Sequence, residues 1–182
     1  MTTITQTEQA VPSGTWNVDP VHSQVGFAVD YMVGTFRGTF SPVTAQLVVA
    51  ADGTATLTGT APVSGITVQD ENLSTHLQSP DFFDAERTPE LSFASKQIRR
   101  IGDEIAIDGD LTIRGVTIPV QLEGTIGEPA DDPYGGVRFW LKLSTTIDRT
   151  QFGLNWNNPL PNGEPALANE VTVSAELYLV KA

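Results

Sequence analysis

Two histidines, His22 and His76, are the side chains of this sequence best suited to acid–base or metal chemistry near neutral pH. As a metal pair they would need carboxylates such as Asp19 or Asp70, but no His-Glu-x-x-His motif or comparable ligand spacing is present. Ser23 follows His22, yet no Gly-x-Ser-x-Gly motif marks a nucleophilic serine. A glycine-rich phosphate loop and a dinucleotide fingerprint are also absent. The sequence therefore predicts no catalytic residue, no metal site and no cofactor.

Arginines are scarce in this acidic chain, and a guanidinium group is a good partner for a carboxylate or a phosphate. We expect Arg149 to pair with Asp148 or Asp84 and so to hold the loop that follows it. Arg114, at the tip of an expected hairpin, is predicted to be solvated. The candidates for contact with a polar head group are His22, Arg37, His76 and Arg149.

Aromatic residues gather in the expected strands and in two expected loops, residues 81–84 and 148–170. For any single ring, a place in a packed core is the simplest role. Together, two loops that carry aromatic residues over a barrel fit an apolar pocket with a lid. Trp156 would then cap the pocket or anchor its loop. The residues that we expect to bind an apolar tail are Phe27, Tyr31, Phe36, Phe40, Phe93, Phe139 and Phe152.

The elements that must position these side chains are clearest in residues 105–126, where apolar and polar residues alternate on both sides of Arg114-Gly115. This pattern predicts two half-buried strands joined by a two-residue turn. The expected pairs are Ile113 with Val116, Leu111 with Ile118, Ile107 with Leu122, Gly109 with Val120 and Gly124 with Ile105. Small residues face large ones in this register, as a curved and closely filled surface requires. We expect a central hairpin of an antiparallel barrel or sandwich.

Alternation elsewhere predicts further strands, giving about eight in all, without the βαβ pattern of a parallel sheet. Residues 70–79 break the two-residue rhythm and predict one short helix, capped by Asp70 and stopped by Pro80. Residues 148–170 form a long loop of the kind that is uncommon unless functional. Short strands with regular turn signals favour an all-β, up-and-down antiparallel barrel. An eight-stranded interior is either filled by side chains or holds one small ligand.

The composition sets outer limits on the function. The chain of 182 residues fits one domain over residues 15–182, preceded by a polar tail at 1–14 that we expect to be disordered. It has no cysteine, hence neither a disulfide nor a thiolate. A net charge of −12 argues against nucleic acid and anionic membrane surfaces as partners. No apolar run approaches the ~20 residues of a spanning helix. If Met1 is the genuine start, the absence of a secretory signal predicts a cytoplasmic protein.

Five motifs follow one another across residues 15–180. They are Trp16-x-x-Asp19-x-x-His22-Ser23-x-Val25-x-Phe27, Gly38-x-Phe40, His76-Leu77-x-Ser79-x-Asp81-Phe82, Gly109-x-Leu111-x-Ile113-x-Gly115-Val116-Thr117-x-Pro119-Val120 and Arg149-x-x-Phe152-Gly153. This ordered set resembles the YceI-like family of polyisoprenoid-binding, lipocalin-like barrels. The resemblance implies an extended eight-stranded antiparallel barrel whose elongated cavity takes a polyprenyl chain, a quinone or a fatty-acid derivative. The chain departs from the family pattern at Tyr31, where relatives often have histidine, and at Leu73-Ser74, where they often have Arg-Asp.

We therefore expect a non-enzymatic protein that binds, stores or transports a long-chain amphiphile in its barrel. Two alternatives stay open. One is a small lipid-processing enzyme that uses His76 with Asp70 or Asp81 as acid and base. The other is a fully packed barrel that serves as an interaction module. The expected partner is a lipid, not a nucleic acid, and a homodimer is also considered.

Overall fold

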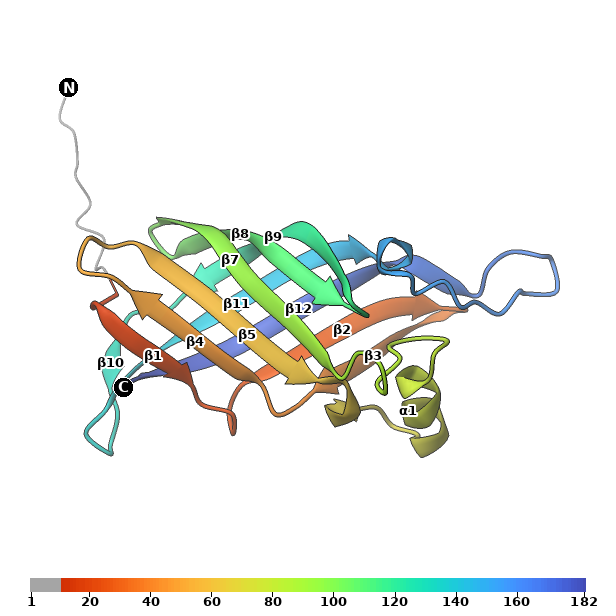
Figure 1. Ribbon diagram of the computed structural model, residues 1–182, viewed down its shortest axis with the longest axis horizontal. Coiled ribbons are helices and arrows are strands. Elements are labelled where there is room, and N and C mark those ends of the chain that lie inside the picture. The colour runs from red at the N-terminus through yellow and green to blue at the C-terminus, as the bar shows by residue number, and fades with distance from the viewer. Residues whose placement is uncertain (1–10) are drawn as a thin grey trace, which may run out of the picture.

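The alternating segments fold into antiparallel strands that close into an elongated barrel (Figure 1). The computed structural model describes residues 11–182. Its strands are β1 (Gly14–Val18), β2 (Gln24–Tyr31), β3 (Gly34–Phe40), β4 (Thr44–Val49), β5 (Ala55–Pro62), β6 (Ile66–Thr67), β7 (Glu90–Ile101), β8 (Glu104–Ile113), β9 (Val116–Ile126), β10 (Ala130–Asp131), β11 (Val137–Asp148) and β12 (Leu167–Lys181). The predicted all-β antiparallel barrel is confirmed.

Two positions in the barrel wall are each occupied by a pair of strands. β1 and β2 lie one after the other along β12, with Val18 opposite Leu179 and Phe27 opposite Val173. β3 pairs with β2, and β4 pairs with β1, so these two strands also share one position. Together with β5, β7, β8, β9, β11 and β12 they form a closed eight-stranded barrel, which the pairing of β11 with β12 completes.

The β8–β9 hairpin has the predicted register, with Ile113 opposite Val116 and each further expected pair in place. Arg114 and Gly115 both have positive φ, 54° and 73°, as two-residue turns that match the twist of a hairpin require. Gly124 lets β9 approach β11 closely, because a Cβ atom at this position would lie 1.7 Å from the Lys142 carbonyl oxygen.

The predicted short helix is present as α1 (Glu71–Gln78). The Asp70 side chain caps it by accepting a hydrogen bond from the Leu73 N–H at 3.0 Å, and Leu77 is buried on its inner face. Figure 1 places α1 at the end of the barrel where the loop between β11 and β12 also projects. Of the helices in residues 11–182, none is long and apolar enough to cross a membrane.

The opposite end of the barrel is filled by the protein's own side chains. Trp16 packs edge-on against Phe139 with ring centroids 4.8 Å apart. Both rings belong to a larger apolar cluster with Ile107, Leu141 and Leu179, and each of these five side chains is at most 3% exposed. The predicted disordered tail lies mostly in residues 1–10, outside the described residues. Val11 packs against this same cluster, and β1 begins at Gly14.

Candidate functional site

The half of the barrel next to α1 encloses a cavity of about 390 Å³. Residues from β2, β3, β4, β5, β7, β8, β9, β11 and β12 form its walls, and α1 with the segments around Phe82 and Trp156 covers it. Within the described part of the chain, the titratable side chains that line it are Tyr31, His76 and Arg149. A mostly apolar enclosure with a few polar groups is typical of a small-molecule site, and it contradicts the alternative of a fully packed barrel.

Small residues at inward positions leave this space open. Ala45 on β4, Gly59 and Ala61 on β5, and Ala175 on β12 line the cavity. At the other end, Trp16 and Phe139 bring two large rings into the apolar cluster. Gly59 and Ala61, two small residues at successive inward positions of β5, are a signal in the sequence that could have located the cavity.

Five of the seven aromatic residues predicted to bind a tail line the cavity: Phe27, Tyr31, Phe36, Phe40 and Phe93. The ring of Phe27 lies 5.7 Å from that of Phe36 and 5.8 Å from that of Phe40, measured between centroids. Phe83, from the expected lid loop, packs edge-on against Phe40 at 5.3 Å. These rings form a continuous aromatic wall.

Phe139 and Phe152, the other two predicted tail-binding residues, are not among the lining residues. Phe139 belongs to the filled end, against Trp16. Phe152 ends the short 3₁₀ helix η2 (Arg149–Phe152) and is 1% exposed within the core cluster beside the cavity. Alternation predicts which face of a strand a residue takes, but it carries no information on depth along the barrel.

His76 lies on α1 at the covered end of the cavity. Its Nε2 is 3.0 Å from Oδ2 of Asp81, and its ring meets Phe82 and Trp156 edge-on, with centroids 5.0 Å away in each case. Because Asp81 engages Nε2, Nδ1 is the nitrogen that a ligand could use. Asp70, the other carboxylate considered for His76, instead caps the helix.

Arg149 is 4% exposed and directs its guanidinium at the loop that follows it and at the start of β12. Its Nε donates to the Ala168 carbonyl at 2.8 Å, and its Nη1 donates to the carbonyls of Leu154 at 2.6 Å and Trp156 at 2.8 Å. Nη2 makes longer contacts, 3.4 Å each, with the Leu167 carbonyl and Oδ1 of Asn169. Burial lowers the pKa of Arg149, and the charge of Asp148 opposes that shift.

The role predicted for Arg149 in holding the loop is therefore supported, but the predicted partners are wrong. Backbone carbonyls take the place of Asp148 and Asp84. The Asp148 carboxylate instead accepts hydrogen bonds from Thr150, whose N–H is 2.9 Å away. A guanidinium has five N–H donors. Two of them are directed at the loop, to Leu154 and Trp156, and the other three at the first residues of β12. Arg149 thus supplies positive charge beside the cavity without a spare donor.

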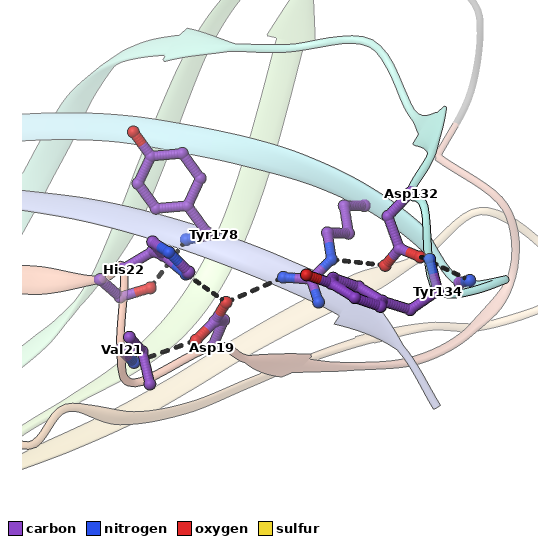
Figure 2. Close-up of polar contacts among 9 residues, drawn as sticks. Asp19, Val21, His22, Asp132, Tyr134 and Tyr178 are labelled. Carbon is purple, nitrogen blue, oxygen red and sulfur yellow. Dashed lines mark hydrogen bonds and ion pairs between the residues drawn. The ribbon is translucent and has the colours of Figure 1, made fainter.

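His22, a predicted head-group residue, lies outside the cavity. It is exposed on the connection between β1 and β2, where its Nδ1 is 2.7 Å from Oδ2 of Asp19. Arg138 donates to the same Asp19 oxygen at 2.8 Å and also to Asp132 (Figure 2). The hydrogen bond from His22, together with that from Arg138, lowers the pKa of Asp19 to about 2 despite an opposing effect of burial. This network joins the strand connection to β11.

The sequence also led to predictions for Arg37 and Arg114. Arg37, a predicted head-group residue, is exposed on β3 and is not a lining residue. Arg114, predicted to be solvated, donates from Nη1 to the Gly153 carbonyl at 2.8 Å, so that the β8–β9 turn supports the loop after β11. A contact across 39 residues leaves no local signal in the sequence.

The pattern of the YceI-like domain matches residues 16–179. The chain belongs to the YceI-like domain family. It is 32% identical over 164 residues to a UPF0312 protein of Staphylococcus epidermidis, covering 88% of this chain and 94% of that protein. It is 31% identical over 144 residues to protein YceI of Escherichia coli O157:H7, covering 73% of this chain and 71% of that protein.

Two solved structures share the fold. BcnA of Burkholderia cenocepacia superposes with a TM-score of 0.74 at 22% identity, covering 88% of this chain and 98% of BcnA. A polyisoprenoid-binding domain from Saccharophagus degradans, implicated in plant cell wall breakdown, superposes with a TM-score of 0.68 at 10% identity, covering 92% of this chain and 98% of that domain.

Proposed function

We propose that this YceI-like protein binds a long-chain amphiphile, with the apolar tail in the cavity and the polar head beside His76, and that it stores or transports this lipid. The observation that carries the proposal is the 390 Å³ apolar cavity with its wall of aromatic rings. The polyisoprenoid-binding name of the Saccharophagus degradans domain supports a polyprenyl tail as the first ligand to test. Family membership and the binding name of that relative favour a carrier over an enzyme.

The tail has one direction open to it in this arrangement. Trp16 and Phe139 fill the far end, so a chain enters at the α1 end and its head stays there. Burial contributes up to ~0.8 kcal/mol per CH₂ before ordering costs are subtracted. Arg149 has no spare N–H donor, so His76 is the side chain that we propose to contact the head group.

A variant that fills the cavity tests the proposal. Ala175 lines the cavity on β12, whereas Glu176 is exposed on the opposite face of the same strand. We expect Ala175→Phe to reduce uptake of a fluorescent polyprenyl probe by about 10-fold or more, and Glu176→Phe to change it less than about 2-fold, because only the first ring occupies tail volume. Ala61→Leu is a milder cavity-filling variant for use if Ala175→Phe has too low a melting temperature for the assay.

Equal uptake by the filling variants and the control would contradict the proposal. Extraction of the purified protein with organic solvent, followed by mass spectrometry, tests it independently. We expect a stoichiometric lipid or stoichiometric uptake of added polyprenol. Recovery of neither would also contradict the proposal.

The His76–Asp81 pair supports one second candidate, a lipid-processing enzyme. A carboxylate that orients an imidazole is the arrangement of a general base. Incubation of the protein with a panel of lipid esters, followed by product analysis across pH, distinguishes the two. Turnover that is lost in His76→Gln would favour the enzyme, and recovery of intact lipid would favour the carrier.

A further inference from the structure

The tip of the β2–β3 hairpin exposes two large apolar side chains. Met32 and Val33 form the two-residue turn between the paired residues Tyr31 and Gly34. Val33 is 107% exposed relative to the reference state, the highest value among the large hydrophobic side chains of residues 11–182, and Met32 is 59% exposed. Two adjacent apolar side chains in water at a protruding turn have no role in packing the core.

The backbone of this turn also disfavours these residues. Met32 has a φ of 52°, in the left-handed region where glycine and asparagine are preferred and a bulky side chain is strained. Hairpin turns of two residues commonly place Gly, Asn or Asp at this position for that reason. Folding alone would therefore select a small or polar residue here, and the Met-Val pair needs another explanation.

The turn is directly connected to the cavity. Tyr31, the residue before it, lines the cavity, and so does Phe36 on the returning strand. The N–H of Met32 donates to the Ala166 carbonyl at 2.8 Å, in the loop that also carries Trp156 over the cavity. Figure 1 shows the β2–β3 tip at the same end of the barrel as α1.

The charge around the Met32-Val33 turn and its small apolar area favour a lipid surface as its binding partner. Residues 31–34 carry no charge, and Asp30 and Arg37 farther along the hairpin have opposite signs. Since the whole chain has a net charge of −12, an anionic membrane would repel it, whereas an uncharged bilayer would not. A specific protein interface buries roughly 800 Å² on each partner, far more than two side chains offer. Insertion of a few apolar side chains into the headgroup region needs no such area.

We propose that the Met32-Val33 turn inserts into the surface of an uncharged lipid bilayer and holds the entrance of the cavity against it. This proposal rests on the proposed lipid-binding function and names the surface from which the lipid is taken or to which it is delivered.

Flotation of the full chain with phosphatidylcholine vesicles tests the proposal. The test variant is Met32→Gly/Val33→Ser, which places preferred turn residues at the tip and should not lower the melting temperature. The matched control is Ile101→Ser, since Ile101 is 79% exposed at the end of β7, at the filled end of the barrel. We expect the wild type to float with the vesicles. The double variant should partition at least about 10-fold less than the wild type, and partitioning of the control should stay within about 2-fold of the wild type. Added salt should not release the wild type.

The outcomes separate this inference from the proposed function. Uptake of the polyprenyl probe without vesicles reports on the cavity alone and should be equal in wild type and double variant. A wild type that takes up the probe but does not float overturns the docking proposal and leaves the binding function standing. Flotation that survives in the double variant, or that falls equally in Ile101→Ser, overturns it as well. Self-association that depends on Met32-Val33 without flotation would assign the tip to a second copy of the chain instead.

Discussion

Replacement of Arg149 by methionine should loosen the loop after β11 and destabilise the whole barrel. Methionine keeps much of the length of the side chain but removes all five donors. Three of the contacts that are lost are short, 2.6–2.8 Å, to the carbonyls of Ala168, Leu154 and Trp156.

The magnitude follows from two opposing quantities. A hydrogen bond from a charged group contributes about 1.5–3 kcal/mol, so the three short bonds amount to roughly 5–9 kcal/mol. Removing the buried guanidinium also recovers several kcal/mol of desolvation that folding had to overcome. The difference predicts a loss of about 2–4 kcal/mol in the free energy of unfolding. For a chain of this size that lowers the melting temperature by about 4–16 °C.

Urea denaturation and hydrogen exchange measure the two effects. We expect amide protection between Leu154 and Leu167 to fall more than protection in β8 and β9. Arg37→Met is the matched control, because Arg37 is exposed on β3, and it should change stability by less than about 0.5 kcal/mol. Arg149→Lys keeps the charge with three donors and should recover only part of the loss. The reasoning is refuted if Arg149→Met is as stable as Arg37→Met and its loop amides are equally protected.

Three further predictions concern regions outside the cavity cover. The pKa of Asp19 is lowered from 3.8 to about 2, so the stability that this carboxylate provides is present above pH 4 and is lost as the pH falls towards 2. Asp19→Asn should therefore make the midpoint of unfolding less dependent on pH over this interval. An unchanged pH profile would contradict the assignment. Phe139→Ala should destabilise the filled end by about 3–5 kcal/mol in urea denaturation while leaving polyprenyl-probe affinity within about 2-fold, and a selective loss of affinity would place this ring in the site. Gly124→Ala should lower stability by at least about 2 kcal/mol through its clash with the Lys142 carbonyl. Gly34→Ala should not, because a Cβ atom there meets no atom within 4 Å. Thermal melts of the two variants measure the difference.

Local sequence signals account for most of the fold. The alternation over residues 105–126 predicted the register of β8 and β9, because a one-residue slip would turn every apolar side chain to the wrong face. Asp70 predicted the start of α1 because a capping carboxylate acts within one turn of its helix. The helix cap joins residues that are close along the chain, and the strand pairs are related by a single hairpin turn.

The site was less predictable because its decisive contacts either involve backbone carbonyls or depend on the tertiary fold. The charge of Arg149 suggested a carboxylate partner, but its partners are backbone carbonyls that carry no residue identity. The proximity of His22 to Asp19 was visible, but its distance from the cavity depends on where β1 gives way to β2 along β12. Phe139 faces inward as its strand pattern indicates, yet it lies at the filled end.

The packing of Trp16 against Phe139 closes the barrel at the end away from α1. If the proposed amphiphile enters at the α1 end, it would also leave by that end, with its head group first. An acceptor of the proposed lipid would then contact its head group before its tail. Under the proposed function, the indole of Trp16 would also limit the length of tail that the cavity holds, and the rest of a longer tail would stay outside the cavity.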